Sequence, residues 1–175
     1  MHHDDHLFRT PMHRLLVGLG LFGLPLVAIP PISGAFEAAT RVVGVATVVD
    51  GDTLEIRGER IRLHAIDAPE SDQLCRRSDG AVWPCGRRAA FALADKIGRG
   101  TVTCHGRDTD RYGRLVAVCF HQGQDLNGWM VLNGWAVAYR RFGQDYVREE
   151  DAARTARRGV WSGTFDMPWD WRRAR

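Results

Sequence analysis

The pattern of apolar and polar positions divides most of the chain into short strands followed by helices. Segments 41–49 and 53–56 are rich in β-branched residues, and the turn residues Asp50-Gly51-Asp52 separate them. Apolar and polar residues alternate in the third segment, 60–66, so a strand there directs Arg62 away from the apolar face. The three segments predict an antiparallel meander.

The second half of the chain has helical spacing in three places and strand-like spacing in two. The predicted helices are 86–97, 125–133 and 145–158, and the predicted strands are 101–104 and 114–120, joined by the polar connection HGRDTDRYG. The resulting order is three strands, one helix, two strands and two helices. This order is typical of a mainly β fold with added helices, of the α+β class.

Composition places the chain among ordinary globular proteins. It has 175 residues, of which 45% are hydrophobic and 26% charged. Fibrous, coiled-coil and wholly disordered proteins are excluded by these proportions. The net charge is +3, and Lys96 is the only lysine among the 24 Lys and Arg residues. Arginine binds phosphate oxygens two at a time. A preference for Arg over Lys can equally reflect the amino-acid usage of the whole proteome, with no bearing on function.

The first residues have the layout of a secretory signal peptide. Residues 15–29 are apolar and uncharged, they follow two arginines, and they lead into small residues before Ala35. We predict a signal peptide over 1–35, cleaved after Ala35 or, alternatively, after Ala38. The run is short for a transmembrane helix, which needs about 20 residues, and an uncleaved membrane anchor is the competing interpretation. We therefore expect an exported protein, periplasmic or extracellular, with no membrane attachment after cleavage.

The cysteines agree with export. The chain contains Cys75, Cys85, Cys104 and Cys119, all beyond the predicted leader. An even number of cysteines in an exported chain favours disulfides. We predict the local pairing, Cys75 with Cys85 and Cys104 with Cys119, because each pair brackets a candidate loop or hairpin. No paired-cysteine or HExxH motif supports a zinc enzyme.

A dense group of charged residues lies between the first strands. Its members are Asp50, Asp52, Arg62, Asp67 and Glu70. Neighbouring carboxylates repel, so they are stable together only beside a cation or an arginine. Two aspartates with carbonyl and water oxygens suit a hard ion such as calcium. Taken separately, the aspartates of 50–52 are also explained as turn residues, and 67–70 as a strand exit.

Five motifs in a fixed order carry a resemblance to a known family. They are VVDGDTLEI, RIRLHAIDAPE, DRYGRLVAVC, DLNGWMVLNGWA and EEDAARTARRGVWS, spread over residues 41–163. This combination resembles the thermonuclease family, the staphylococcal-nuclease-like domains. The resemblance implies a five-stranded OB-fold β-barrel with three helices over 41–163. It also implies hydrolysis of phosphodiester bonds in DNA and RNA.

The resemblance assigns roles to individual residues. It implies a calcium site at Asp52, Asp67 and Ala68, and catalytic roles for Arg62, Glu70 and Arg114. Many family members have threonine where Ala68 stands, but the ligand there is a backbone carbonyl, which alanine also supplies. The arginines and the ion would stabilise the charged phosphate, while Glu70 accepts a proton from the attacking water or holds it in line. The products implied are a 5′-hydroxyl and a 3′-phosphate.

Two tyrosines are candidate substrate contacts. Tyr112 resembles the family's phosphate-contacting tyrosine, and Tyr139 lies near the position where related enzymes rest a base. The segment around Tyr139, AVAYRRFGQDY, is a residue shorter than in the best-known relative. An ordinary half-buried aromatic is therefore as good an interpretation of Tyr139 as a stacking platform.

Two segments lie outside the motifs quoted above, and the first of them, an insertion, departs from the best-known relative. The insertion 71–85 carries Arg76, Arg77 and Trp83, which either border the active-site mouth or belong to a loop closed for stability alone. The tail 164–175 is rich in Trp and Arg, and we expect it to be a strap packed on the barrel or the helices.

The leading hypothesis is an exported, calcium-dependent nuclease that prefers single-stranded or frayed DNA and RNA and has no stable protein partner. The main alternative is a catalytically inactive OB module that binds nucleic acid. A structural envelope protein is a third possibility, but it leaves the acidic and arginine cluster unexplained.

Overall fold

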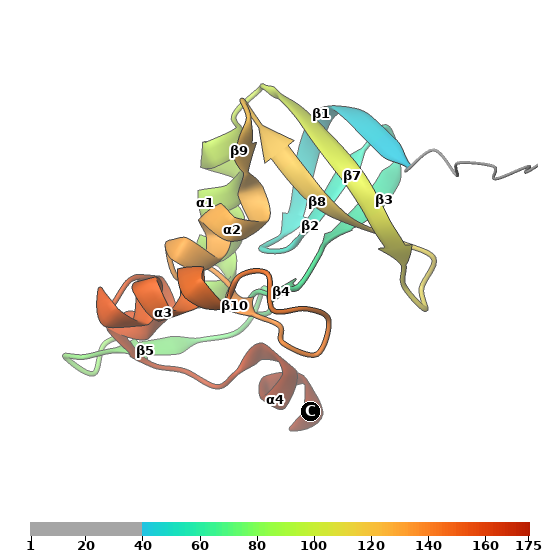
Figure 1. Cartoon of the computed structure of the whole chain (residues 1–175). Coiled ribbons are helices and arrows are strands. Elements are labelled where there is room, and N and C mark those ends of the chain that lie inside the picture. Colours follow the sequence, from blue (N-terminus) through green and yellow to red (C-terminus); the bar gives the residue numbers. More distant parts are fainter. Residues whose placement is uncertain (1–39) are drawn as a thin grey trace, which may run out of the picture. The chain divides into compact units, whose positions relative to one another are not determined.

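Five strands of the computed structural model close into a barrel (Figure 1), and the structure describes residues 40–175. The strands are β1 (Arg41–Asp50), β2 (Thr53–Ile56), β3 (Glu59–Leu63), β7 (Thr101–Thr109) and β8 (Leu115–His121). They pair in the order β3-β2-β1-β7-β8, and a parallel pairing of β3 with β8 closes the ring. The predicted α+β barrel is confirmed. The predicted leader, 1–35, lies outside the described residues.

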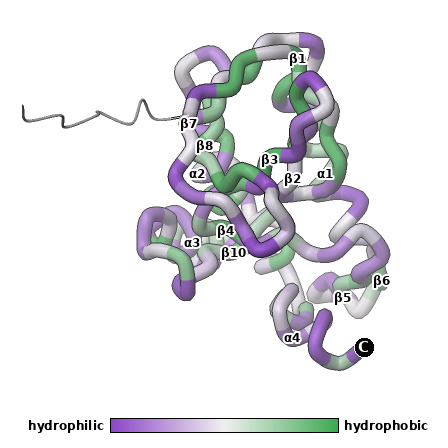
Figure 2. Tube along the Cα trace, turned by 90° about the vertical axis from the view of Figure 1, so that its right-hand side faces the viewer, coloured by the Kyte–Doolittle hydropathy of each residue, from purple (hydrophilic) through white to green (hydrophobic). Residues whose placement is uncertain are grey.

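Alternation along the strands fills the barrel. Leu54 and Ile56 of β2 and Ile61 and Leu63 of β3 are all buried in the main core, whereas Arg62 between the last two points to the other face. Figure 2 shows that hydrophobic and hydrophilic stretches follow one another along the trace of the barrel. The period of two read from the sequence therefore corresponds to the inside and outside of the barrel.

Two strand ends differ from the prediction. The third strand ends at Leu63 rather than residue 66, because Ala65 adopts a left-handed φ of 56° and turns the chain into β4 (Ile66–Asp67), which pairs with β10 (Val137–Ala138). The strand β7 continues to Thr109 rather than stopping at 104. Its polar residues extend the hairpin with β8, whose ladder supplies their backbone hydrogen bonds.

Of the four α-helices among residues 40–175, three were predicted. The helices are α1 (Cys85–Ile97), α2 (Leu126–Leu132), α3 (Val147–Thr155) and α4 (Pro168–Arg173), with a 3₁₀ turn η1 (Gly159–Ser162) and the short strand β9 (Gln124–Asp125) between them. Ala89, Leu93 and Ile97 bury one face of α1 against the core. The extra helix α4 lies in the tail, at the end of the molecule where β4, β5 and β10 are found (Figures 1 and 2).

No helix among residues 40–175 is long and apolar enough to cross a membrane.

The insertion forms a second, smaller core. Its strands β5 (Cys75–Arg77) and β6 (Val82–Trp83) pair with each other, and β5 also pairs with β11 (Gly163–Thr164) of the tail. Trp83 is buried there and meets Trp135 edge to face at 6.4 Å between ring centroids. Neither Trp83 nor the two arginines of β5 lines the candidate site. The structure thus favours the stabilising interpretation of the insertion.

Both disulfides of the local pairing are present. Cys75 is bonded to Cys85 in the second core, and Cys104 of β7 is bonded to Cys119 directly across the ladder in β8. The described residues contain no free cysteine.

One aspartate stabilises the junction between α2 and α3. Asp125 caps α2 by accepting a hydrogen bond from the Gly128 backbone N–H at 3.1 Å, and its second oxygen accepts the Tyr146 hydroxyl at 2.9 Å. Burial and the charge of Asp125 raise the pKa of Tyr146 above its ordinary value, so this hydroxyl remains a donor.

We predict that Asp125→Ala lowers the free energy of unfolding by about 2 to 3 kcal/mol, because the helix cap is lost and the Tyr146 hydroxyl is left unpaired. Urea unfolding followed by circular dichroism measures the change. Asp151→Ala, at an exposed position of α3, is the matched control, and an equal effect of both substitutions would contradict the prediction.

Candidate active site

Most residues assigned to the site from the sequence line one open cavity of about 770 Å³. They are Asp52, Arg62, Ala68, Glu70, Tyr112, Arg114 and Tyr139. Asp67 does not reach the cavity surface, but it is fully buried directly beside it and is hydrogen-bonded to Arg62. The fold therefore brings together residues that are up to 87 positions apart, from 52 to 139.

Asp52 ties the β1–β2 turn to the exit of β4. Its backbone carbonyl accepts the Leu63 N–H at 2.8 Å, and its side-chain Oδ2 accepts the Ala68 N–H at 2.7 Å. The Asp52 side chain is only 8% exposed. A buried carboxylate needs such donors, since water does not reach it.

Arg62 lies between the two buried aspartates. Its guanidinium forms an ion pair with Asp52 and donates to Asp67 Oδ1 at 2.8 Å and to the Ile66 carbonyl at 3.3 Å. The turn at Ala65 makes this possible, because it brings Asp67 back alongside Arg62 five residues later in the chain. Burial lowers the pKa of Arg62, while the Asp67 and Asp50 carboxylates act in the opposite direction.

Arg114 is held by an aspartate that the sequence analysis did not single out. Asp110 Oδ2 accepts Arg114 Nε at 2.7 Å, and Oδ1 accepts the backbone N–H groups of Tyr112 and Arg114. Burial raises the pKa of Asp110, but these hydrogen bonds outweigh it and the net pKa is lowered. Asp110 therefore stays charged and fixes the direction of Arg114. In the sequence, Asp110 could have been recognised as the first residue of the DRYGR motif.

Tyr112 stands at the open rim of the cavity. It is 69% exposed, and its ring lies beneath two guanidinium groups, that of Arg111 at 4.8 Å and that of Arg114 at 5.5 Å. An exposed aromatic ring among arginines is a surface that suits both bases and phosphates.

The comparisons with known proteins agree with this geometry. The family described as "Staphylococcal nuclease homologue" matches residues 60–163, more than half of the chain. This chain belongs to the staphylococcal nuclease family.

Curated relatives cover a large part of this nuclease-family chain. The succinoglycan biosynthesis protein ExoI of Rhizobium meliloti is 39% identical over 127 residues, which are 71% of this chain and 66% of that protein, just under two thirds. The micrococcal nuclease of Shigella flexneri is 36% identical over 149 residues, covering 74% of this chain and 79% of the relative. An uncharacterized endonuclease of Haemophilus influenzae is 31% identical over 156 residues, 85% of this chain and 82% of that one. The thermonuclease-type assignment is confirmed.

In this nuclease-family protein the backbone around Glu70 is held from two sides. Gln73, fully buried, accepts the Glu70 N–H at 3.2 Å and donates to the Asp166 carbonyl at 2.7 Å. On the other side, the start of α1 approaches so closely that a Cβ on Gly86 would lie 1.6 Å from the Glu70 carbonyl oxygen. The position of Glu70 therefore depends on glycine at 86.

The tail reaches the same site. Arg172 of α4 donates to both oxygens of Asp67, at 3.1 and 2.8 Å, and to Glu70 Oε1 at 2.6 Å. Trp169, one turn earlier, stacks on Tyr139 at 5.3 Å with an interplanar angle of 9°. The tail does pack as a strap, but sequence reasoning missed that its contacts are with site residues. The only signal was the richness of the tail in Trp and Arg.

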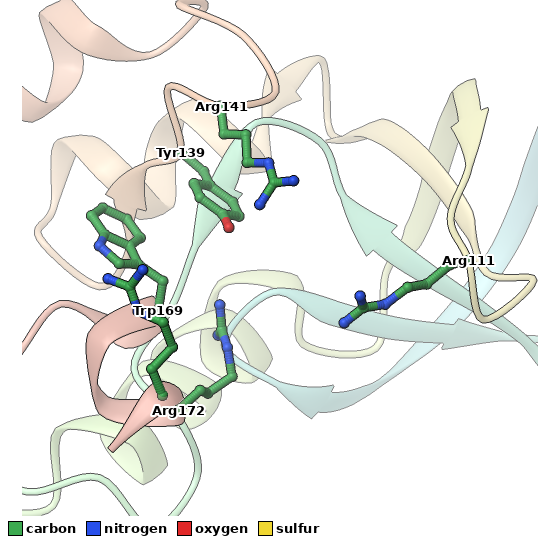
Figure 3. Close-up of a pocket in the computed structure, with 6 residues that line it drawn as sticks. Arg111, Tyr139, Arg141, Trp169 and Arg172 are labelled. Carbon is green, nitrogen blue, oxygen red and sulfur yellow. The ribbon is translucent and has the colours of Figure 1, made fainter. Parts of the chain in front are cut away.

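A smaller cavity of about 490 Å³ adjoins the first. In Figure 3, Arg111 extends into it from the β7–β8 hairpin, Tyr139 and Arg141 from the loop after β10, and Trp169 and Arg172 from α4. The wall combines two aromatic rings with several positive charges.

The residues predicted from the sequence to hold a metal ion offer oxygen donors, namely the carboxylates of Asp52 and Asp67 and the backbone carbonyl of Ala68. Within the part of the chain that the structure describes, no group of three or more His, Cys, Asp or Glu side chains is arranged to hold a metal ion.

We predict that Gly86→Ala lowers the nuclease rate on single-stranded DNA at least about 100-fold, since displacing a reacting group by about 1 Å has effects of this size. Initial rates with a labelled oligonucleotide measure the effect. The exposed neighbour in the same helical turn provides the control Arg87→Ala. Unchanged activity of Gly86→Ala would show that Glu70 does not depend on this contact.

Proposed function

We propose that this protein is an exported, calcium-dependent nuclease that hydrolyses phosphodiester bonds of both DNA and RNA. The observation that carries the proposal is the single cavity lined by Arg62, Glu70 and Arg114. Family membership supports the same activity, as do relatives named micrococcal nuclease and endonuclease.

The donors favour a hard divalent cation, and the resemblance to the thermonuclease family favours calcium. Carboxylates and carbonyls are hard oxygen ligands, which calcium and magnesium prefer over softer metals. Asp52 and Asp67 are both buried, and Arg62 contacts both of them, so their oxygens face a common region. Asp52, Asp67 and the Ala68 carbonyl would hold the ion, with water oxygens as further ligands. When bound, the ion would supply positive charge to the phosphate that is attacked.

The remaining residues act directly on the substrate. A phosphodiester repels nucleophiles by its own negative charge, so the guanidinium groups of Arg62 and Arg114 stabilise the charge that develops during attack. Glu70 accepts a proton from the attacking water or holds that water in line. Attack opposite the 5′ oxygen releases a 5′-hydroxyl and leaves a 3′-phosphate.

The cavity wall favours single-stranded or frayed substrates. Tyr112 is exposed at the rim, and a flexible strand can place a base against it, which a stacked duplex base cannot do. The arginine-lined walls contact phosphates, which DNA and RNA share. This supports action on both nucleic acids. We propose no stable protein partner.

The competing function is an inactive module that binds nucleic acid on the same barrel. It is disfavoured because the complete set of Asp52, Arg62, Asp67, Glu70 and Arg114 is present, and binding alone does not require Glu70.

We predict that the protein digests single-stranded DNA and RNA with calcium and fails to do so with EGTA. Arg114→Ala should lower the rate by about 100- to 1000-fold, the range measured for loss of one donor that stabilises transition-state charge. Gel assays on labelled oligonucleotides test both statements, with Arg99→Ala, outside both cavities, as the control. Binding without cleavage under every metal tried would instead identify the inactive module.

Export yields a separate prediction. The protein recovered from the periplasm or medium should begin at Phe36, or at Ala39 if cleavage follows Ala38, as intact mass spectrometry would show. A full-length chain confined to the membrane fraction would contradict export and support the anchor interpretation.

A further inference from the structure

The tail helix α4 places two side chains on residues that the proposed reaction needs. Arg172 contacts Asp67 and Glu70, and Trp169 contacts Tyr139. The two contacts lie one helical turn apart on α4, and together they cover a proposed metal ligand, the proposed base and a candidate substrate contact.

Arg172 donates hydrogen bonds to the carboxylate of Asp67, which a metal ion would use as a ligand. Each oxygen of Asp67 accepts a hydrogen bond from Arg172, and Oδ1 also accepts one from Arg62. A carboxylate surrounded in this way has little capacity left for a cation. Burial lowers the pKa of Arg172, but the hydrogen bonds that it donates to Asp67 and Glu70 outweigh burial and raise the pKa overall, so the guanidinium remains charged.

The contact of Trp169 resembles that of a bound base. The indole lies nearly parallel to the Tyr139 ring, with 5.3 Å between centroids, and Phe142 meets the same ring edge to face at 4.9 Å. A nucleobase stacking on Tyr139 would use the face that Trp169 now covers.

The helix α4 is attached weakly enough to leave the site. The helix has six residues, too few to be stable in isolation, and Arg172 remains 39% exposed at its ion pairs. Asp67 itself is fully buried, so Arg172 can leave only when another cation takes its place. The segment before α4 is anchored independently by the hydrogen bond from Gln73 to the Asp166 carbonyl and by pairing of β11 with β5. The helix can therefore leave the site while the preceding chain stays in place.

We propose that α4 is an autoinhibitory strap, in which Arg172 occupies the place of the divalent cation and Trp169 the place of a nucleobase. Calcium and single-stranded nucleic acid bind in competition with α4 and displace it. The inference rests on the proposed nuclease function, because it takes Asp67 as a metal ligand. By linkage, the energy that holds α4 in the site is subtracted from the binding energy of each ligand.

The first test measures calcium binding directly, without nucleic acid. Calcium chloride is titrated calorimetrically into the full chain and into its variants Arg172→Gln and Arg173→Gln. Arg173 is the matched control, because it lies on the same helix, is 76% exposed and, among residues 40–175, forms its ion pair with Asp170 of α4 alone. We expect Arg172→Gln to bind calcium about tenfold more tightly, within the usual range of coupling between two sites, and Arg173→Gln to match the wild type. Equal affinities in both variants would overturn the proposal.

The second test concerns Trp169 and does not depend on the stability of the Arg172 variant. Fluorescence anisotropy in EDTA measures binding of a labelled oligodeoxythymidylate to Trp169→Ala and to the control Trp171→Ala. Competition predicts binding about fivefold tighter than wild type for Trp169→Ala. Weaker binding would overturn the proposal, because Trp169 would then be part of the substrate platform.

Cleavage assays on the same variants separate this inference from the proposed function. If no variant cleaves nucleic acid with calcium but Arg172→Gln still binds the ion more tightly, the nuclease function fails, whereas the competition between α4 and calcium is supported. If the wild type cleaves with calcium and Arg172→Gln leaves calcium affinity unchanged, the strap alone is overturned. Absence of calcium binding in every variant would overturn both.

Discussion

Two carboxylates buried beside each other, those of Asp52 and Asp67, require positive charge at close range. Removing a carboxylate from water costs several kcal/mol unless it is paired and hydrogen-bonded. The structure meets this requirement with Arg62, which contacts both, and with Arg172, which covers the outer side of Asp67. A divalent cation beside these carboxylates would also supply positive charge. Under the proposal above, that ion and Arg172 are alternative partners for the oxygens of Asp67, while Arg62 stays in place.

The need to keep Asp52 and Asp67 beside Arg62 explains the course of the surrounding backbone. The left-handed turn at Ala65 returns Asp67 to Arg62, and the Ala68 N–H reaches back to Asp52. Closure of the barrel through β3 and β8 then sets the β7–β8 hairpin, with Arg114, across the same cavity. Asp110 positions Arg114, and Gln73 positions the backbone of Glu70, each by a hydrogen bond. The charge pattern of the sequence did not single out either residue. Such supporting residues determine the geometry of the site. Mutagenesis limited to the charged residues predicted from the sequence would overlook their contribution.

The second core adds a physical link between the insertion and the tail. Trp83 and the Cys75–Cys85 disulfide form a rigid base, and β11 pairs with β5 of that base immediately before α4. A terminal segment is usually poorly ordered unless it is tied down. Here the sheet and the Gln73 hydrogen bond deliver α4 to the site, so the insertion contributes to the active-site environment although none of its Arg or Trp side chains lines the cavity.

By itself, the sequence determined what depends on local periodicity and on short motifs. The strands around Leu54 and Ile61, the helix carrying Leu93, and the local pairing of cysteines follow from alternation, helical spacing and loop length, all of which act over a few residues. Only the tertiary structure decided that β3 ends at Leu63, that Asp110 orients Arg114, and that Arg172 reaches Asp67 from 105 residues away. Contacts of that separation depend on the closing of the barrel and the course of the tail, and no pattern within a single segment encodes them.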